Sequence, residues 1–306
     1  MTPVTVRVPA KVNLQLSVGP RRDDGYHDLV TVYHAVSLFD EVTVQSADKT
    51  SVRVTGQDAA SVPAGRANLA ARAARALAAR LNRRRKSGVQ IEIRKRIPMA
   101  AGLAGGSADA AATLVACNDL WDAGLTPAEL REVAAGLGSD VPFALLGGTA
   151  VGQGRGERLT AALAAGSYHW VLAFAAGGLS TPEVYAACDR LRAARGSGHE
   201  AALSTELMAA LRSGDPAAVG PLLSNDLQPA AISLRPDLRR ALAAGPEFGA
   251  LGAIVSGSGP TCAFLAANAG HARELAVSLT GAGVCRGAVR VRGPAAGATV
   301  VAAEPG

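Results

Sequence analysis

The chain has 306 residues, of which 49% are hydrophobic and 18% are charged, and its net charge is +6 at pH 7. This length suits two domains with sizeable cores, and the composition is typical of a soluble globular protein. No apolar run approaches the ~20 residues that span a bilayer, and the first residues alternate like a strand, unlike a signal peptide. The four cysteines lie far apart without metal-type spacing, so we expect free thiols and a cytoplasmic protein.

The excess of Lys and Arg raises the question of nucleic-acid binding. The densest basic run, Arg83 to Lys86, contains no aromatic residue, and aromatic residues make up only 4% of the chain. Platforms on which bases could stack are therefore scarce. We therefore expect this run to be a solvated loop, and we expect no nucleic-acid partner. The net positive charge would suit small phosphorylated substrates.

The first half of the chain predicts strands mixed with helices. Expected strands cover residues 4–9, 13–18, 29–36, 41–45, 51–54, 89–93, 147–152 and 157–159, with a Pro-Ala-Lys turn between the first two. Expected helices cover residues 68–81 and about 107–121, and a third helix begins near Pro127 and ends near the glycines at 136 and 138.

The second half continues in the same way and completes an α+β arrangement. Expected strands cover residues 169–174, 253–256 and 261–265, followed by one or two closing strands. Expected helices cover residues 183–194, about 205–212, about 234–244 and 271–279, and we expect the tail from Gly293 to be loosely held at its end. We divide the chain into an N-terminal domain of residues 1–160 and a C-terminal domain of residues 161–306.

The segment from Pro98 to Ala112 reads PMAAGLAGGSADAAA and joins a predicted strand to an alanine-rich helix that begins near Ser107. Glycines let the backbone turn sharply and approach a ligand, and a helix start presents unpaired N–H groups and the positive end of its dipole. The segment therefore predicts a site for an anion such as phosphate. A connection that needs glycine only for its turn would look the same. The P-loop, dinucleotide and protein-kinase patterns do not match.

Two further polar residues lie in apolar surroundings. Lys11, in Pro-Ala-Lys-Val-Asn, follows a short apolar strand and requires a carboxylate or phosphate partner if buried. A surface lysine with a buried stem is the alternative. Asp140 lies between a helix end and Val-Pro-Phe and requires a cation or hydrogen-bond donors. Its alternative is a cap of the helix end or an Asx turn.

Together these segments resemble the motifs of the GHMP small-molecule kinases, named for galactokinase, homoserine kinase, mevalonate kinase and phosphomevalonate kinase. The three motifs are Pro-x-Lys-x-Asn, P-x3-G-L-x-G-G-S-x-x-A-A and the segment Gly257-Ser-Gly-Pro-Thr-Cys262, and the similarity runs from about Val6 to Leu265. Within the family, three segments resemble the branch whose alcohol substrate is a cytidine diphosphate-linked methylerythritol of the non-mevalonate isoprenoid route. They are Asp23–His27, Leu137–Phe143 and Ser180–Tyr185.

The resemblance implies a two-domain fold with a ribosomal-S5-like N-terminal domain, a ferredoxin-like C-terminal domain and the site in the cleft between them. It implies ATP as phosphoryl donor, Mg²⁺ as cofactor and the 2-hydroxyl of the small-molecule alcohol as acceptor. Asp140 is implied as the catalytic base, or as an electrostatic orienter if proton transfer is late. Lys11 is implied beside it, keeping the carboxylate ionised and neutralising charge on the moving phosphoryl group.

The remaining implied residues fall into three groups. ATP is implied to contact Pro98, Ala101, Gly102, Leu103, Ala104, Gly105, Gly106 and Ser107, with Asn68 and Lys95 near the nucleoside. The substrate is implied to contact Asn13 through its erythritol portion, Tyr26 by stacking, His27 by hydrogen bonds, and Thr181 and Tyr185 in the cytidine pocket. The site is implied to be lined from the C-terminal side by Gly257, Ser258 and Gly259.

The match is loosest in the glycine-rich segment. Ala100, Ala101 and Ala104 occupy positions where the family often has glycine, which makes the backbone stiffer. Ala108 replaces a second serine that is frequent in the family, so Ser107 is the candidate metal ligand there. Asp109 receives no role.

Alternative functions use the same residues. Tyr26 and His27 could be hairpin residues, and Tyr185 could belong to a core. A GHMP kinase for another alcohol, such as mevalonate or homoserine, would have no use for a cytosine pocket. A sensor that only binds nucleotide would not need both Lys11 and Asp140.

Overall fold

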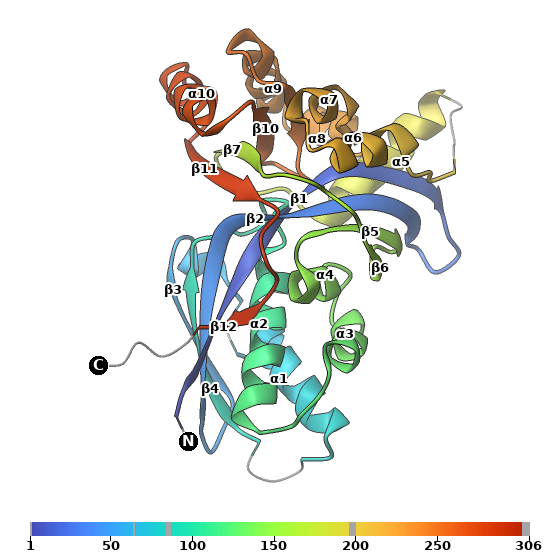
Figure 1. Cartoon of the computed structure of the whole chain (residues 1–306). Helices are drawn as coiled ribbons and strands as arrows, with labels where there is room; N and C mark the ends of the chain where they lie inside the picture. Colours follow the sequence, from blue (N-terminus) through green and yellow to red (C-terminus); the bar gives the residue numbers. More distant parts are fainter. Residues whose placement is uncertain (1, 64, 84–86, 196–199, 302–306) are drawn as a thin grey trace.

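The computed structural model describes residues 2–63, 65–83, 87–195 and 200–301 of the chain. Within these ranges the strands form a sheet of eight strands and a sheet of four, and helices pack on both (Figure 1), as an α+β chain predicts. The helices are α1 (Leu69–Arg80), α2 (Gly105–Leu120), α3 (Pro127–Ala135), α4 (Val141–Leu146), α5 (Thr181–Arg195), α6 (Thr205–Ser213), α7 (Pro216–Val219), α8 (Gln228–Leu234), α9 (Asp237–Glu247) and α10 (Ala269–Gly281), with 3₁₀ turns at Ala59–Ser61, Gly65–Ala67 and Gly220–Leu222.

The larger sheet is dominated by two long antiparallel strands, β1 and β2, which run from the N-terminal end of the molecule to a position beneath α5 and α6 (Figure 1). Along the main path the strand order is β12-β1-β2-β4-β3, while β5 and β8 pair with β2 and β1, respectively, and β6 pairs with β5. The strands are β1 (Val4–Arg21), β2 (His27–Ser46), β3 (Ser51–Gly56), β4 (Val89–Lys95), β5 (Thr149–Gly154), β6 (Arg158–Ala161), β8 (Ser224–Asn225) and β12 (Thr299–Val300).

The predicted breaks within β1 and β2 were wrong. Both strands continue through the expected interruptions, and the register shifts between Pro9 and Ala10. A bulge accommodates a proline within a sheet because the local ladder hydrogen bond is already lost there. The continuous strand has a functional consequence: Val8, Ala10 and Val12 enter the main hydrophobic core, whereas Lys11 and its neighbour Asn13 line a cavity on the opposite face.

The second sheet has the order β11-β7-β10-β9 and carries the helices of the C-terminal half. Its strands are β7 (Tyr168–Phe174), β9 (Gly252–Val255), β10 (Cys262–Ala266) and β11 (Gly287–Gly293). The helix expected over residues 234–244 is divided, since Leu234 ends α8 and Asp237 begins α9. Helices α4, α7 and α8 were not predicted because each is too short to show a helical period.

The end of the chain returns to the first sheet. Val300 pairs with Val6, and Ala296 forms a bridge with Gly147. Residues 293–301 are therefore held against the first sheet, whereas the end of the tail, residues 302–306, to which the prediction applies, lies outside the described ranges. The main core also joins both halves, since Leu114 and Trp170 belong to it. The division at residue 160 stays a prediction.

The structure tests in part the two expectations that concern membrane-spanning segments and the basic run. Within the described ranges, none of the helices is long and apolar enough to cross a membrane. In the basic run, Arg83 is not simply solvated, because its guanidinium lies 5.4 Å from the centre of the Trp121 ring. Residues 84–86 of this run lie outside the described ranges.

Candidate active site

The glycine loop, residues 98–107, leads from β4 into α2, which begins at Gly105, two residues earlier than predicted. Ala100 and Ala104 both have positive φ, 50° and 59°, a conformation that costs an L-residue roughly 1–2 kcal/mol. Their strain is held by the surrounding contacts, as is common at functional sites. The alanines therefore keep a backbone shape that glycine would adopt freely.

Gly102 lies at the contact between this loop and the C-terminal half. A Cβ at this position would lie 2.0 Å from the backbone oxygen of Ser256, so only glycine fits. The Ser256 hydroxyl donates to the Gly102 oxygen at 3.1 Å, and the Thr261 N–H donates to the oxygen of Ala101 at 3.3 Å. The two glycine-rich motifs of the sequence are thus fastened to each other.

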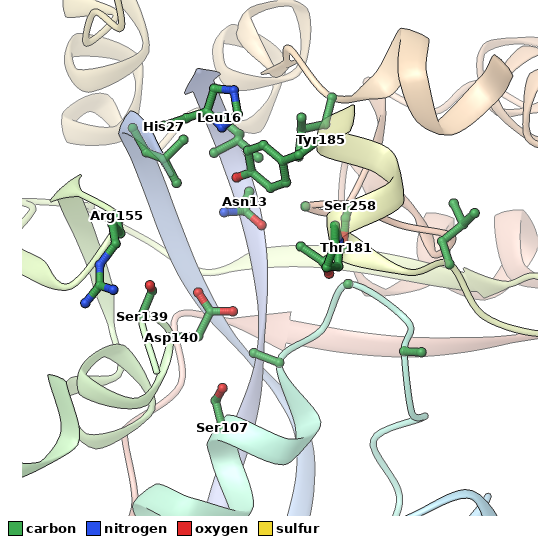
Figure 2. A pocket seen from close by; sticks show the side chains of 18 of the residues that line it. Asn13, Leu16, His27, Ser107, Ser139, Asp140, Arg155, Thr181, Tyr185 and Ser258 are labelled. Carbon is green, nitrogen blue, oxygen red and sulfur yellow. The ribbon is translucent and has the colours of Figure 1, made fainter. Parts of the chain in front are cut away.

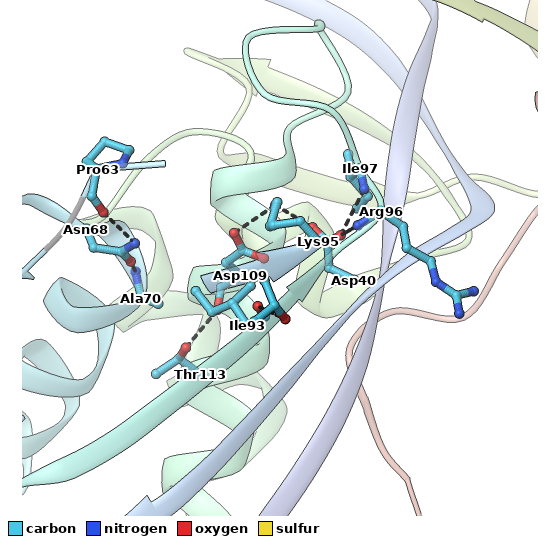
Figure 3. Close-up of polar contacts among 11 residues, drawn as sticks. Asp40, Pro63, Asn68, Ala70, Ile93, Lys95, Arg96, Ile97, Asp109 and Thr113 are labelled. Atoms are coloured by element: carbon cyan, nitrogen blue, oxygen red, sulfur yellow. Dashed lines mark hydrogen bonds and ion pairs between the residues drawn. The ribbon is translucent and has the colours of Figure 1, made fainter. Parts of the chain in front are cut away.

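A buried group of three charges, Lys95, Asp40 and Asp109, lies beneath the start of α2 (Figure 3). The Lys95 ammonium donates to Asp40 at 2.5 Å and to Asp109 at 2.8 Å. Burial acts to lower the pKa of Lys95, but the two carboxylates outweigh it and raise this pKa. Burial also raises the pKa of Asp109 to about 7, against the opposing effect of Lys95. These three side chains, the ion trio, support the glycine loop from the side that faces away from the cavity.

Lys95 and Asn68, which were predicted near the nucleoside, do not line the cavity, and their contact with ATP stays a prediction. The Lys95 side chain is 0% exposed, so its ammonium serves the ion trio and does not reach the cavity. Asn68 caps α1, since its side chain accepts from the Ala70 N–H at 2.8 Å and donates to the Pro63 oxygen at 2.9 Å (Figure 3). Its polar atoms are already used, although its neighbour Leu69 lines the cavity.

On β1, a chain of hydrogen bonds fixes the predicted lysine. Lys11 is only 6% exposed, which excludes the surface alternative. Its ammonium donates to Asn13 at 2.5 Å, the Asn13 amide donates to Thr31 at 2.8 Å, and Thr31 donates to the Gln15 oxygen at 2.7 Å. Burial lowers the pKa of Lys11, and the nearby Asp140 carboxylate opposes this effect.

Asp140 immediately precedes α4 but makes no side-chain hydrogen bond that caps the helix, so the capping alternative is wrong. Its carboxylate accepts instead from the hydroxyl of Tyr33 at 2.9 Å. In Figure 2 this carboxylate lies between the Ser107 hydroxyl and Asn13. Asp140 is thus directed into the cavity.

The far end of the cavity is aromatic. The His27 and Tyr185 rings lie 5.1 Å apart at an angle of 30°, and His27 Nε2 lies 2.8 Å from Asp189 Oδ1. Tyr26 is 54% exposed at the rim, and the guanidinium of Arg155 lies 4.9 Å from the centre of its ring. This end can accept a planar base, with charged groups at its edges.

The C-terminal motif closes the cavity beside the lysine. Gly257 has a φ of 56°, and a Cβ there would lie 3.0 Å from the Lys11 ammonium. Asn225 donates to the oxygens of Val255 and Gly257, both at 2.7 Å. The hydroxyls of Thr181 and Ser258 lie 2.8 Å apart and join α5 to this loop.

All these parts surround one cavity of about 650 Å³ (Figure 2), a size typical of small-molecule sites. It brings together most of the predicted residues: Lys11, Asn13, Tyr26, His27, Ala101, Gly102, Ala104, Gly105, Gly106, Ser107, Asp140, Thr181, Tyr185, Gly257 and Ser258. Three predicted residues shape the site without lining it, namely Pro98, Leu103 and Gly259. Leu103 is buried, but its backbone oxygen accepts from the Lys11 N–H at 3.3 Å.

Sequence reasoning missed several residues that the structure places at the site. Tyr33, Arg155 and Asp189 line the cavity, and Asn225 holds its C-terminal loop. Only Arg155 carried a visible signal, a cation between two glycines. Asp109, which received no role, belongs to the ion trio.

This arrangement of a phosphate-type loop, a lysine and a carboxylate defines a class of small-molecule kinase. Family models match the chain at the GHMP kinases N terminal domain over residues 68–148 and at GHMP kinases C terminal over residues 207–285. The chain belongs to the GHMP kinase family, which confirms the resemblance of its motifs.

Within this family the chain is similar along nearly its whole length to 4-diphosphocytidyl-2-C-methyl-D-erythritol kinases. The relative from Mycolicibacterium smegmatis is 59% identical, covering 98% of this chain and 93% of its own. The relative from Nocardia farcinica is 55% identical, covering 99% and 98%. A crystal structure of 4-(cytidine 5'-diphospho)-2C-methyl-D-erythritol kinase is 35% identical with a TM-score of 0.75, covering 94% of this chain and 98% of that one.

A more distant structure shares the fold alone. The mevalonate kinase of L. major in complex with R-mevalonate has a TM-score of 0.74 at 17% identity, covering 95% of this chain and 96% of that one. The shared fold therefore does not specify the alcohol, and the choice of alcohol depends on the residues of the cavity.

Proposed function

We propose that this protein transfers the γ-phosphoryl group of ATP to the 2-hydroxyl of 4-diphosphocytidyl-2-C-methyl-D-erythritol, a reaction of the non-mevalonate isoprenoid route. One observation carries the proposal: the glycine loop, the Lys11–Asp140 region and the His27–Tyr185 aromatic pair line the same cavity. The glycine loop would bind phosphates, the Lys11–Asp140 region would carry out proton transfer, and the aromatic pair would hold a planar base. Relatives of this name at 54–59% identity support the choice of substrate.

The donor end is formed by the glycine loop and α2. The first N–H groups of α2 have no partner within the helix, and they point with the positive end of the helix dipole toward a bound anion. We assign the ATP phosphates to this position, with Ser107 as an additional hydroxyl donor. Lys95 contributes from behind the loop, where the ion trio fixes the backbone that binds the phosphates.

The chemical step belongs to Asp140 and Lys11. As the substrate hydroxyl oxygen bonds to the γ-phosphorus, the bond from that phosphorus to the β–γ bridging oxygen of ATP breaks and ADP leaves. The hydroxyl proton passes to the Asp140 carboxylate, and Lys11 stabilises the charge of the moving group. Phosphoryl transfer relies mainly on such positioning and electrostatic stabilisation.

The acceptor end is the aromatic part of the cavity. We assign the cytosine to the space beside Tyr26 and Tyr185, where stacking and hydrogen bonds to His27 would hold it. Asn13 would orient the erythritol portion near Asp140. Arg155, which lines the same cavity, would face the substrate diphosphate.

Mg²⁺ is the metal that this chemistry uses, and it is held mainly by waters, phosphates and one or two protein oxygens. Ser107 is such an oxygen donor on the wall of the cavity. Within the described ranges, no group of three His, Cys, Asp or Glu could hold a metal by itself, which fits a metal bound largely through ATP. When bound, Mg²⁺ neutralises phosphate charge.

The proposal is tested by a panel of alcohols with γ-labelled ATP. We expect label transfer to 4-diphosphocytidyl-2-C-methyl-D-erythritol at a kcat/KM at least ~100-fold above that for homoserine or mevalonate, because only the first substrate fills the aromatic end. Transfer to homoserine or mevalonate but not to the cytidine substrate would overturn the assignment. ATP binding without transfer to any of the three would indicate a nucleotide sensor.

We also propose a cytoplasmic location. The four cysteines are free thiols, as expected in a reducing compartment that supplies ATP.

A further inference from the structure

Tyr33 is the hydrogen-bond donor to the Asp140 carboxylate, and the family motifs in the sequence do not include it. Its hydroxyl lies 2.9 Å from Asp140 Oδ1, and the residue is 2% exposed on β2. Asp140 makes no capping hydrogen bond to α4. The phenol therefore holds one carboxylate oxygen and leaves the other one directed to the cavity.

Tyr33 is itself held in place on three sides. Its ring stacks on Phe143 of α4 at 4.8 Å and 24°. Gly152 and Gly156 leave space for it, since a Cβ at Gly156 would lie 2.3 Å from the Tyr33 hydroxyl and one at Gly152 would lie 2.7 Å from the ring. A side chain larger than hydrogen at either position would displace the phenol, so the β5–β6 hairpin is shaped around it.

The surrounding charges keep this phenol a donor. Burial first, and then the charge of Asp140, raise the pKa of Tyr33 well above its usual value. Glu157 from the hairpin and Tyr185 from α5 act in the same direction. On the opposite strand, the Lys11 ammonium lies 5.8 Å from the centre of the Tyr33 ring. Tyr33 therefore stays protonated and donates its hydrogen bond to the Asp140 carboxylate.

We propose that Tyr33 is a positioning residue for the phosphoryl-transfer step, which fixes the Asp140 carboxylate with one oxygen aimed at the substrate hydroxyl. The inference rests on the proposed function, since it assigns a partner to the base of that reaction. A hydrogen bond to a charged group is stronger than one between neutral groups, so its removal frees the carboxylate to turn away from the substrate hydroxyl.

The test is Tyr33→Phe, which removes only the hydroxyl. We expect kcat to fall about ten-fold while the KM for ATP stays within about two-fold. In an Asp140→Asn background the same substitution should cost little further activity, because the two residues act as a unit.

Phe143→Leu provides the matched control, because it removes the ring stacked on Tyr33 and keeps the hydroxyl. It should lower the melting temperature but leave kcat close to the wild-type value. Wild-type kcat in Tyr33→Phe, or an equal loss of kcat in Phe143→Leu, would overturn the inference.

A turnover-independent measurement separates this inference from the proposed function. Carbon NMR of labelled aspartate, assigned with Asp140→Asn, observes the Asp140 carboxyl directly. Its chemical shift at a fixed pH should change in Tyr33→Phe even if the cytidine substrate proves wrong, because the hydrogen bond is lost, and an unchanged chemical shift would refute the role of Tyr33.

Discussion

Arg155 places a positive charge at the rim of the cavity. It lies in the β5–β6 turn between Gly154 and Gly156, its guanidinium contacts the Tyr26 ring, and it lines the cavity. Guanidinium groups bind phosphate oxygens through paired hydrogen bonds. A substrate with a diphosphate between its base and its alcohol would place that charge near this side chain.

Arg155→Gln should therefore raise the KM for the cytidine substrate about ten-fold, by loss of a charge-assisted hydrogen bond, and leave the KM for ATP nearly unchanged. Steady-state kinetics with each substrate varied in turn measures this. Arg158→Gln is the matched control, since Arg158 is exposed on the same hairpin and does not line the cavity. Equal effects of the two substitutions would indicate general charge and not a specific contact.

Among single residues, those that belong to contiguous motifs could be predicted from the sequence. Lys11 and Asp140 could be found because each interrupts an apolar segment, and their motifs match a known family. Tyr33 and Asp189 could not, because neither lies in a short pattern and each reaches its partner only through the fold. The partners of Lys95 could not be predicted for a related reason: Asp40 lies 55 residues away in the sequence and Asp109 lies 14 residues away, in the next element.

At the scale of elements, the ion trio ties β2, β4 and α2 together at the base of the glycine loop. Asp40 also accepts from the backbone N–H groups of Arg96 and Ile97, at 2.6 and 2.9 Å. The orientation of the loop therefore depends on a lysine that does not line the cavity.

Lys95→Met should destabilise the protein by about 3–5 kcal/mol, because it leaves two buried carboxylates without their cation. Urea unfolding followed by circular dichroism measures this change. Arg94→Met is the control: Arg94 is exposed and its pair with Glu41 spans 3.6 Å, so its loss should cost no more than about 1 kcal/mol. If Lys95→Met is as stable as Arg94→Met, Lys95 does not stabilise the fold, and a role in nucleotide binding would account for it instead.

Element types were predicted well where the period was long and the caps were clear. Helix α1 begins after Asn68, as predicted, and α3 begins with a capping box formed by Thr126 and Glu129. The sequence predicted β1 and β2 each as two shorter strands, because a bulge at Pro9 resembles a turn in sequence. Short helices such as α8 depend on packing between neighbouring elements and leave no periodic signal.

At the scale of the whole molecule, His34 lies at the junction of the two sheets. Its ring meets the edge of Tyr168 on β7 at 5.6 Å, and a Cβ at Gly293 of β11 would lie 2.2 Å from its Nε2. The residue is 0% exposed, and this burial lowers its pKa from 6.5 to about 3. The junction therefore requires the neutral imidazole.

This burial predicts acid sensitivity of the fold. Between pH 6.5 and about 3 the unfolded chain binds a proton at His34 that the folded chain does not, so stability falls as the pH falls, by about 1.4 kcal/mol per unit. Replacing His34 with Gln should remove about 2 kcal/mol of the difference in unfolding free energy between about pH 7.5 and about pH 5. Urea denaturation at both pH values tests this, and an unchanged difference would show that His34 is not the group responsible.

The joint between the halves is also the part of the fold least visible in sequence. The return of β12 to β1 and the shared core depend on contacts between residues hundreds of positions apart. Local patterns carry no information on such pairings. The cavity between the halves is limited in the same way, and its glycine loop, taken alone, predicts only a site for an anion.

The central claim is that this cavity transfers a phosphoryl group through Asp140 while the glycine loop holds ATP independently. It is tested most directly by comparing Asp140→Asn with the wild type, measuring turnover of 4-diphosphocytidyl-2-C-methyl-D-erythritol together with ATP affinity by calorimetry. We expect kcat to fall by ~10²–10⁴-fold and the Kd for ATP to stay within about three-fold. Wild-type kcat in the variant would contradict the account.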